Sequence, residues 1–430
     1  MVQSIFKPQQ IIFNPAIDKV VNNLLLVGVF ILLAGNIIFV ITESKIHYYI
    51  FSTLCLLILC LSSRPYLNTV KLLYFFPILV SFAFNFSANY ANLFFILSVL
   101  PYFLVPMVFY NRYFENFSLG AILKIFEWFT LLNFFGLLLQ LQGFQSPFLY
   151  LGYAFTGDVY HERYGSFAGG TLALGLGATV NTINSYYKII YEQRKSKYNF
   201  FMLIVSIATM ILAQSRRFYI MAFIMMLVIY LFNPVKKYNS KKILRALIGV
   251  IVILIVLAIG LYQAKGKFFY LERLLSIADF QNDPANLERI AKWLTAIDAF
   301  LSHIWLGMGI GAAGIIGKNY NETVSITDVF VAESYYLKVF VEAGIVSGIV
   351  FLGLMIVFVR QALICLRSKD VALPALYVMF FFIDSFMSTS LEGPLWAVLF
   401  WLCIAIIMSK EMMLNKSKAI FTKPTFKTVS

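Results

Sequence analysis

Arginines at the ends of long apolar runs are the residues in this sequence best suited to chemistry. Arg216 and Arg217 stand side by side in the short turn between two such runs, and Arg163 precedes another. A guanidinium group can grip a phosphate through two parallel hydrogen bonds, and it stays charged in proteins. These residues therefore indicate a site for a phosphate or pyrophosphate group, where arginine can also stabilise the charge that develops on a leaving group.

Carboxylates stand near the ends of other apolar runs. Glu333 precedes the run 334–359, and Asp384 and Glu392 bracket the turn between the last two runs. A carboxylate can take the proton from an attacking hydroxyl, so we predict Glu333 as a general base, with Asp384 and Glu392 in reserve. Structural alternatives remain: Glu333 as an acid stabilised by a helix dipole, and Asp384 as the buried partner of an arginine. The sequence has no Asp-x-Asp pair, so a carboxylate-held metal has no obvious ligands and we expect none.

Other polar residues receive weaker assignments. His161 and His303 lie in predicted outer loops, either as satisfied loop residues or as contacts to substrate. Lys124 and Glu127 are three residues apart within one apolar run, which suits a local structural ion pair. The segment 309–314 reads Gly-Ile-Gly-Ala-Ala-Gly, a literal GxGxxG. It follows a predicted helix rather than a strand, so we do not assign dinucleotide binding to it.

The composition places these residues in a membrane protein. Apolar residues make up 61% of the 430 residues and charged residues 13%, against about half and about a quarter in soluble domains. A disordered chain is excluded, and a soluble enzyme is disfavoured because one core cannot enclose so much apolar surface. The four cysteines lie in or beside apolar runs without paired spacing, which argues against a disulfide framework and a structural zinc.

The apolar runs predict an all-α polytopic membrane protein with about 12 spans of roughly 20 residues each. Basic residues concentrate in every second connection, as the positive-inside rule requires if both termini are cytoplasmic. The net charge of +14 is then mainly a topology signal, and we expect no nucleic-acid partner. The predicted spans are 21–41, 48–63, 70–87, 91–110, 118–141, 165–190, 199–214, 217–233, 245–264, 334–359, 371–388 and 393–409.

One long outer loop interrupts this pattern. The predicted organisation is nine spans over 1–264, the loop over 265–333, three spans over 334–409 and a basic cytoplasmic tail over 410–430. Long loops are usually functional. Residues 285–302 predict an amphipathic helix that lies on the membrane surface or caps the bundle. Its apolar face is formed by residues spaced three and four apart: Leu287, Ile290, Leu294, Ile297 and Leu301.

Several segments together resemble the O-antigen ligase and polymerase superfamily. Ser215-Arg216-Arg217 is similar to its Ser-Arg-Gly turn, and Arg163-Tyr-Gly165 to its Arg-x-x-Gly segment. The long loop resembles the loop of that superfamily, which has an arginine, a tryptophan and then a Gly-x-Gly-x-Gly segment. Here these are Arg289, Trp293 and Gly307-Met-Gly309-Ile-Gly311. The segment 333–337 (Glu-Ser-Tyr-Tyr-Leu), followed by 342–345 (Glu-Ala-Gly-Ile), is similar to its His-Asn-x-Tyr-Leu segment with the trailing Glu-x-Gly. The resemblance covers about residues 160–350.

The resemblance implies a GT-C-like, metal-independent, inverting glycosyltransferase of the bacterial inner membrane that needs no cofactor. Ligases of this group carry a catalytic histidine where this chain has Glu333, so the resemblance favours a Wzy-type polymerase of O-antigen or a related polysaccharide. We favour Arg216 over Arg217 as the functional arginine because it follows Ser215. The catalytic candidates are Glu333, Arg216, Arg217 and Arg289. The candidates for substrate binding are Arg163, His161, His303, Tyr336, Asp384 and Glu392.

The expected partners are lipid-linked oligosaccharides. The resemblance implies undecaprenyl pyrophosphate as the carrier of both donor and acceptor, and it suggests a chain-length regulator protein. Two alternatives remain open. One is a ligase that moves the glycan to lipid A core or to a protein. The other is a flippase or transporter, which makes no bond and would need charges along a path through the bundle rather than at one face.

Overall fold

The computed structural model describes residues 19–20, 22–31, 34, 46–63, 69–84, 93–109, 119–144, 151–152, 163–168, 170–192, 196–213, 216–232, 284–313 and 332–421. These residues are almost wholly helical, as predicted. The exception is one small antiparallel ladder, in which β1 (Leu151–Gly152) pairs with β2 (Arg163–Tyr164). The predicted span 245–264 lies outside the described residues, as do residues 21, 32–33 and 35–41 of the predicted span 21–41.

The helices follow the predicted runs closely. The loop helix α11 also forms where the spacing of residues 285–302 predicted it. In chain order the helices are α2 (Ile46–Ser63), α3 (Thr69–Phe84), α4 (Leu93–Phe109), α5 (Leu119–Leu141), η4 (Ser166–Ala168), α6 (Thr171–Ile190), α7 (Lys197–Leu212), α8 (Arg216–Leu231), α11 (Pro284–Ser302), α13 (Tyr335–Cys365), α14 (Ala372–Asp384), η5 (Ser390–Glu392) and α15 (Pro394–Phe421).

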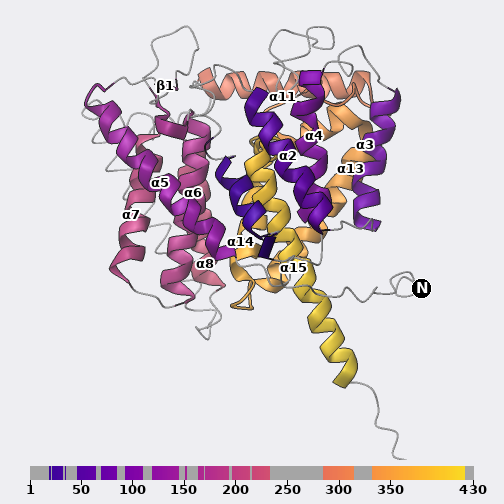
Figure 1. The fold of residues 1–430 in the computed structure, drawn as a ribbon. Coiled ribbons are helices and arrows are strands. Elements are labelled where there is room, and N and C mark those ends of the chain that lie inside the picture. Colours follow the sequence, from indigo (N-terminus) through magenta and orange to yellow (C-terminus); the bar gives the residue numbers. More distant parts are fainter. Residues whose placement is uncertain are drawn as a thin grey trace, which may run out of the picture.

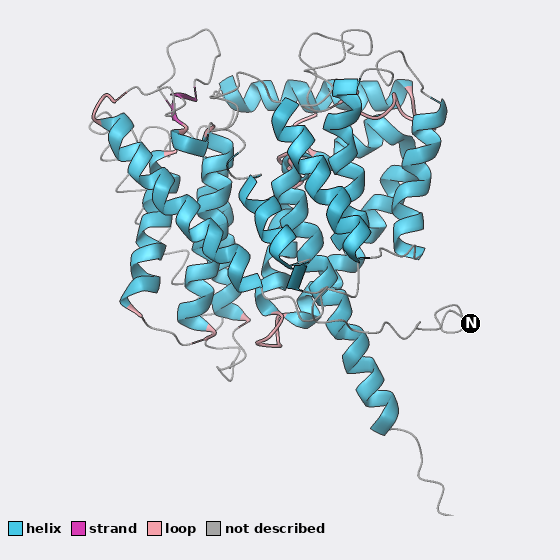
Figure 2. Ribbon diagram, in the orientation of Figure 1, coloured by secondary structure: helices cyan, strands magenta, loops and turns pink. Residues whose placement is uncertain are grey.

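The long helices stand side by side in two groups (Figure 1). Helices α5 to α8 form one group, and α2 to α4 with α13 form the other, with α14 and α15 between them. Helix α11 lies across one end of the bundle and packs on α13 (Figure 2). We call this the α11 end. The chain begins α8 and α13 and finishes α14 at this end.

Large apolar side chains cover the outward faces of several helices. Leu54 on α2, Phe76 on α3, Phe135 on α5 and Ile356 on α13 are all exposed. Such surface is unfavourable in water and suited to lipid. Among the described helices, α5 and α13 are long and apolar enough to cross a membrane, and several others are shorter apolar helices. These features indicate an integral membrane protein; the number of spans and the orientation stay predictions.

Polar and small residues join the helices inside the bundle. Asn181 on α6 donates to the Ser206 hydroxyl on α7 over 2.9 Å. The Tyr377 hydroxyl on α14 donates to the carbonyl of Val180 on α6 over 3.0 Å. Lipid chains are as apolar as the helices themselves, so close packing and such interhelical hydrogen bonds hold a membrane bundle together.

Helix α13 is broken at Gly344, where φ is 75° and ψ is −176°. A break leaves main-chain groups without helical partners, and these must be satisfied in a membrane. The turn after α11 supplies the partners. Met308 N–H donates to the Val341 carbonyl over 2.7 Å, and Gly309 N–H donates to the Glu342 carbonyl over 3.0 Å.

Two glycines allow this turn to approach the break. Ile345 N–H donates to the Ile304 carbonyl over 2.7 Å. A Cβ on Gly344 would lie 2.2 Å from the Trp305 carbonyl oxygen, and one on Gly307 would lie 2.5 Å from the main chain of Glu342. Both glycines also have positive φ. Gly307 and Gly344 thus serve close backbone packing between the turn and the break.

Candidate functional site

A buried ion pair between α8 and the end of α14 forms the centre of the candidate site. The Arg217 Nε lies 3.1 Å from the Asp384 Oδ1, and the two side chains are 5% and 1% exposed. The Arg217 Nη1 donates to the Met387 carbonyl over 3.1 Å. The structure thus provides the buried arginine partner that the sequence left open as an alternative for Asp384.

The hydrogen-bonding capacity of this pair is only partly used. The Nε and Nη2 of Arg217 and both carboxylate oxygens of Asp384 have no hydrogen-bond partner among the described residues. Buried polar groups are nearly always hydrogen-bonded, and an unmatched one calls for an explanation. The charge of Asp384 and the Met387 carbonyl thus hold Arg217 in place, and its Nη2 is left without a partner among the described residues.

Helix α11 and the segment before α13 bring further charges to this pair. The charges of Asp384 and Glu333 attract Arg217, and that of Arg289 repels it. The Lys292 Nζ on α11 lies 3.3 Å from the Glu333 Oε1. Residues from α8, α11, the start of α13 and α14 therefore converge at the α11 end.

Glu333 has a left-handed backbone with φ of 50°, which is uncommon for a residue other than glycine. Such a conformation costs about 1–3 kcal/mol and persists only where its surroundings hold it. Here the neighbouring residues are pinned to the end of α14. Tyr335 N–H donates to the carbonyls of Ser385 (2.9 Å) and Ser388 (3.0 Å). The Ser334 hydroxyl also donates to the Ser385 carbonyl, over 3.3 Å.

Lys292 joins the site although the sequence gave it no predicted role. Burial acts to lower the pKa of Lys292, but the hydrogen bonds and charges of Glu288 and Glu333 outweigh it and raise the pKa. Lys292 therefore stays charged at neutral pH. The Trp293 indole N–H is buried and has no partner among the described residues. The signal for Lys292 in the sequence is the motif that carries Arg289, one helical turn earlier.

The structure places other predicted residues away from the arginines. Glu392 is buried and interacts electrostatically with Lys338 and Glu342 rather than with Arg217. Tyr336 is buried, and its hydroxyl donates to the Phe382 carbonyl over 3.0 Å. The geometry thus assigns Tyr336 to packing between α13 and α14.

The remaining candidates lie at the edge of the site or outside the described residues. Arg216 is half-exposed, so Arg217, rather than the favoured Arg216, is the arginine that meets Asp384. Successive helical side chains point about 100° apart, so only one of two adjacent arginines can face the bundle. His303 is exposed at the end of α11. Only the backbone of Arg163 is described, in β2, and His161 lies outside the described residues.

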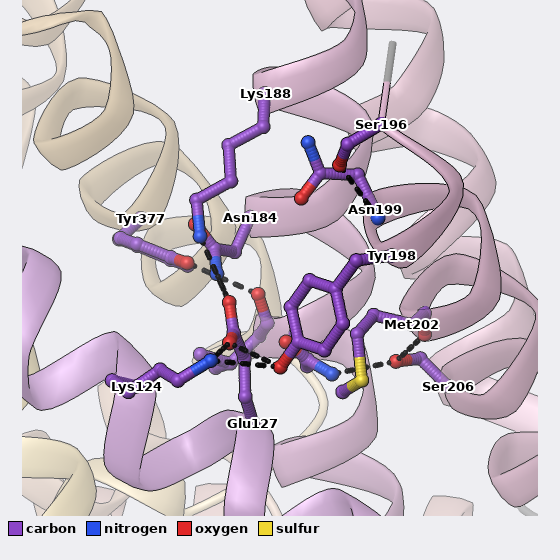
Figure 3. Close-up of polar contacts among 12 residues, drawn as sticks. Lys124, Glu127, Asn184, Lys188, Ser196, Tyr198, Asn199, Met202, Ser206 and Tyr377 are labelled. Atoms are coloured by element: carbon purple, nitrogen blue, oxygen red, sulfur yellow. Dashed lines mark hydrogen bonds and ion pairs between the residues drawn. The ribbon is translucent and has the colours of Figure 1, made fainter. Parts of the chain in front are cut away.

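A second polar cluster lies at the opposite end of the bundle, around the buried carboxylate of Glu127 (Figure 3). Its Oε1 accepts from Lys188 (2.8 Å) and Asn184 (3.2 Å). Its Oε2 accepts from Lys124 (2.9 Å) and Tyr198 (2.8 Å). The predicted local pair of Lys124 and Glu127 is confirmed, within a larger network that joins α5, α6 and α7. Every donor aimed at the carboxylate is used, so the cluster is structural.

One family model matches the part of the chain that holds most of these residues. Residues 201–352 match the family model described as O-antigen ligase. No curated protein matches the chain. The matched segment contains α8, α11 and the start of α13, and so includes Arg217, Arg289, Lys292 and Glu333; Asp384 follows it.

Proposed function

Because residues 201–352 carry an O-antigen ligase family domain, we propose that this protein polymerises lipid-linked oligosaccharide repeat units. The reaction would take place at the outer face of a bacterial inner membrane, on glycans carried by undecaprenyl pyrophosphate. The observation that carries the proposal is the buried Arg217, which keeps unused donors beside Arg289, Lys292 and Glu333. A chain-length regulator is the further partner we expect.

The arginines bind the donor through its pyrophosphate. The free Nη2 of Arg217 meets one phosphate group, and Arg289 adds its charge from α11. Arginine suits this task because its planar group forms two parallel hydrogen bonds and keeps its charge. When the bond between the anomeric carbon and the pyrophosphate oxygen breaks, its electron pair leaves with the lipid pyrophosphate. Fixed positive charges stabilise that leaving group without rearrangement.

Glu333 prepares the acceptor. An acceptor sugar hydroxyl attacks the anomeric carbon of the donor, and its proton passes to the Glu333 carboxylate. Lys292 holds the Oε1 of Glu333 at 3.3 Å, so the second oxygen is left to face the hydroxyl. The product is a longer glycan on the acceptor's lipid carrier, together with free lipid pyrophosphate.

A ligase is the second candidate, and the description of the matched family favours it. The donor and the bond broken are the same, but the acceptor is lipid A core or a protein. The resemblance assigns ligases a histidine where this chain has Glu333, which supports the polymerase. The described part of the α11 end offers no other histidine than the exposed His303.

The test uses the full chain in lipid nanodiscs, with a repeat unit on lipid pyrophosphate as the only substrate. We expect a ladder of longer glycans on a gel, with one lipid pyrophosphate released per bond formed. Addition of lipid A core separates the two candidates. If product forms only with that core, the protein is a ligase. If the repeat unit that the producing strain uses stays unchanged both without and with lipid A core, glycosyl transfer is the wrong function.

A further inference from the structure

Helix α13 carries a buried ion pair that the proposed reaction does not use. The Lys338 Nζ lies 2.5 Å from the Glu342 Oε2, and the side chains are 3% and 2% exposed. Removing two charges from water is costly, and their attraction offsets that cost only with good geometry and additional hydrogen bonds. A buried pair of this kind is therefore a weak source of stability by itself, and its other contacts show what it does.

Glu342 joins three separate parts of the chain. Its Oε1 accepts from the Ala313 N–H over 3.2 Å. Its main-chain carbonyl accepts from the Gly309 N–H over 3.0 Å and from the Ser81 hydroxyl of α3 over 2.7 Å. One residue thus ties α3 and the turn 303–313 to the broken part of α13.

The turn 303–313 continues directly from α11, the helix that carries Arg289 and Lys292. The side of α11 that faces α13 carries Ala296 and Ala299 near Val341, and, close to the turn, Phe300, whose ring meets that of Phe340 edge-on with 5.4 Å between the centroids. Leu294 and Leu301 on the same helix are exposed, 57% and 55%. Alanines provide little apolar contact, and Phe300 lies at the end of α11 next to the turn, so the contacts that fix the helix on α13 are concentrated beside the anchored turn.

We propose that Glu342, held by Lys338, is a positioning residue that fixes α11 and thereby sets Arg289 and Lys292 opposite Arg217 and Glu333. Glu342 does not touch the substrate. Its effect on the reaction rests on the proposed function, whereas its effect on the turn 303–313 does not.

Hydrogen exchange of the full chain in nanodiscs tests the structural part. In Glu342→Ala we expect peptides from 303–313 to exchange at least about tenfold faster, because a locally opened segment loses protection. The matched control is Glu127→Ala, since Glu127 is equally buried (2%) and paired with lysine, but at the opposite end. In that variant the turn 303–313 should exchange as in the wild type.

Two further variants keep the test informative if Glu342→Ala does not fold. Glu342→Gln retains an acceptor for the Ala313 N–H, so it should restore most of the protection. Ser81→Ala removes only the hydroxyl that binds the Glu342 carbonyl, and we expect exchange to rise about twofold to fivefold, in keeping with one lost hydrogen bond. Unchanged exchange at 303–313 in folded Glu342→Ala, or an equal rise in Glu127→Ala, would overturn the proposal.

Kinetics test the link to the reaction. Glu342→Ala should lower kcat/KM for the donor by about tenfold or more, because misplaced groups cost reactivity steeply, while KM for the acceptor stays unchanged. Glu342→Gln should recover most of this loss, and Glu127→Ala should match the wild type per folded molecule. A donor kcat/KM that survives despite faster exchange would contradict the positioning role. If the wild type transfers no glycan, the proposed function fails, and hydrogen exchange alone still decides whether Glu342 anchors α11.

Discussion

Replacing Arg217 with lysine separates the charge of this residue from its hydrogen-bonding geometry. The guanidinium lies 3.1 Å from Asp384, donates to Met387 and keeps the Nη2 unpaired. A lysine has a single nitrogen, which can remain beside Asp384 and preserve the buried ion pair. It has no second nitrogen with which to form the two parallel hydrogen bonds that a guanidinium makes to a phosphate. The variant should therefore fold and still lose the contact that we assign to the leaving group.

The expected loss follows from the value of one fixed donor in a buried site. Removing a single donor that stabilises a developing negative charge typically lowers kcat by about 10²–10³, or roughly 2.7–4 kcal/mol. Arg217 is only 7% exposed, so water cannot readily replace the missing group. We expect the rate of glycan transfer by Arg217→Lys to fall within that range.

The matched control is Arg216→Lys, its half-exposed neighbour in the same helical turn. Because Arg217 rather than Arg216 pairs with Asp384, and a lysine at position 216 keeps the positive charge, we expect less than about a threefold change. Initial rates would be measured in nanodiscs from the release of lipid pyrophosphate, per folded molecule. An Arg217→Lys rate within threefold of the wild type, or a large loss in Arg216→Lys instead, would refute the assignment.

Three further predictions concern the residues around this pair. Glu333→Gln keeps the shape of the side chain but cannot accept a proton, so transfer should slow by about 10²–10⁴; a full-length glycan ladder from this variant would contradict the base assignment. The pKa of Lys292 is raised in the folded protein. The charged lysine therefore contributes its full stabilisation below about pH 10, and this stabilisation is lost as the pH rises through the pKa of Lys292 in the folded state. The difference in Tm between wild type and Lys292→Met should therefore stay constant at neutral pH and shrink in strong alkali, and a difference that grows with pH would count against the charge network. Gly344→Ala should destabilise the protein by at least about 1–3 kcal/mol, since its Cβ would meet the Trp305 carbonyl. The control is Gly353→Ala on the same helix, whose Cβ meets nothing within 4 Å. Equal melting temperatures of the two variants would disprove the account of the break.

The sequence predicted the elements of the site better than their contacts. Spacing alone located α11, because apolar residues three and four apart define one helical face. It did not show which way that face points: Leu294 and Leu301 are exposed, while Ala296 and Ala299 pack against the bundle. The orientation of this helical face depends on how α11 packs against α13, and the spacing of residues within α11 carries no information about that.

The choice between the two adjacent arginines was beyond the sequence for a similar reason. The phase of α8 decides which side chain faces the bundle, and that phase depends on where the helix begins. The partner, Asp384, is far away in the chain and reaches Arg217 only when α14 packs against α8. The break in α13 was also unpredictable, because residues 334–359 form one apolar run and the groups that satisfy the break come from the turn after α11.

The most direct test of the central claim is to locate the pyrophosphate on the protein. The probe is a polyprenyl pyrophosphate with a diazirine next to the phosphates, crosslinked by light to the full chain in nanodiscs. Mass spectrometry of the peptides would then map the site. We predict adducts in α11 and around Glu333, strongly reduced in Arg217→Lys and displaced by unlabelled lipid pyrophosphate. Adducts at the Glu127 end of the bundle, or labelling that ignores Arg217, would contradict the account.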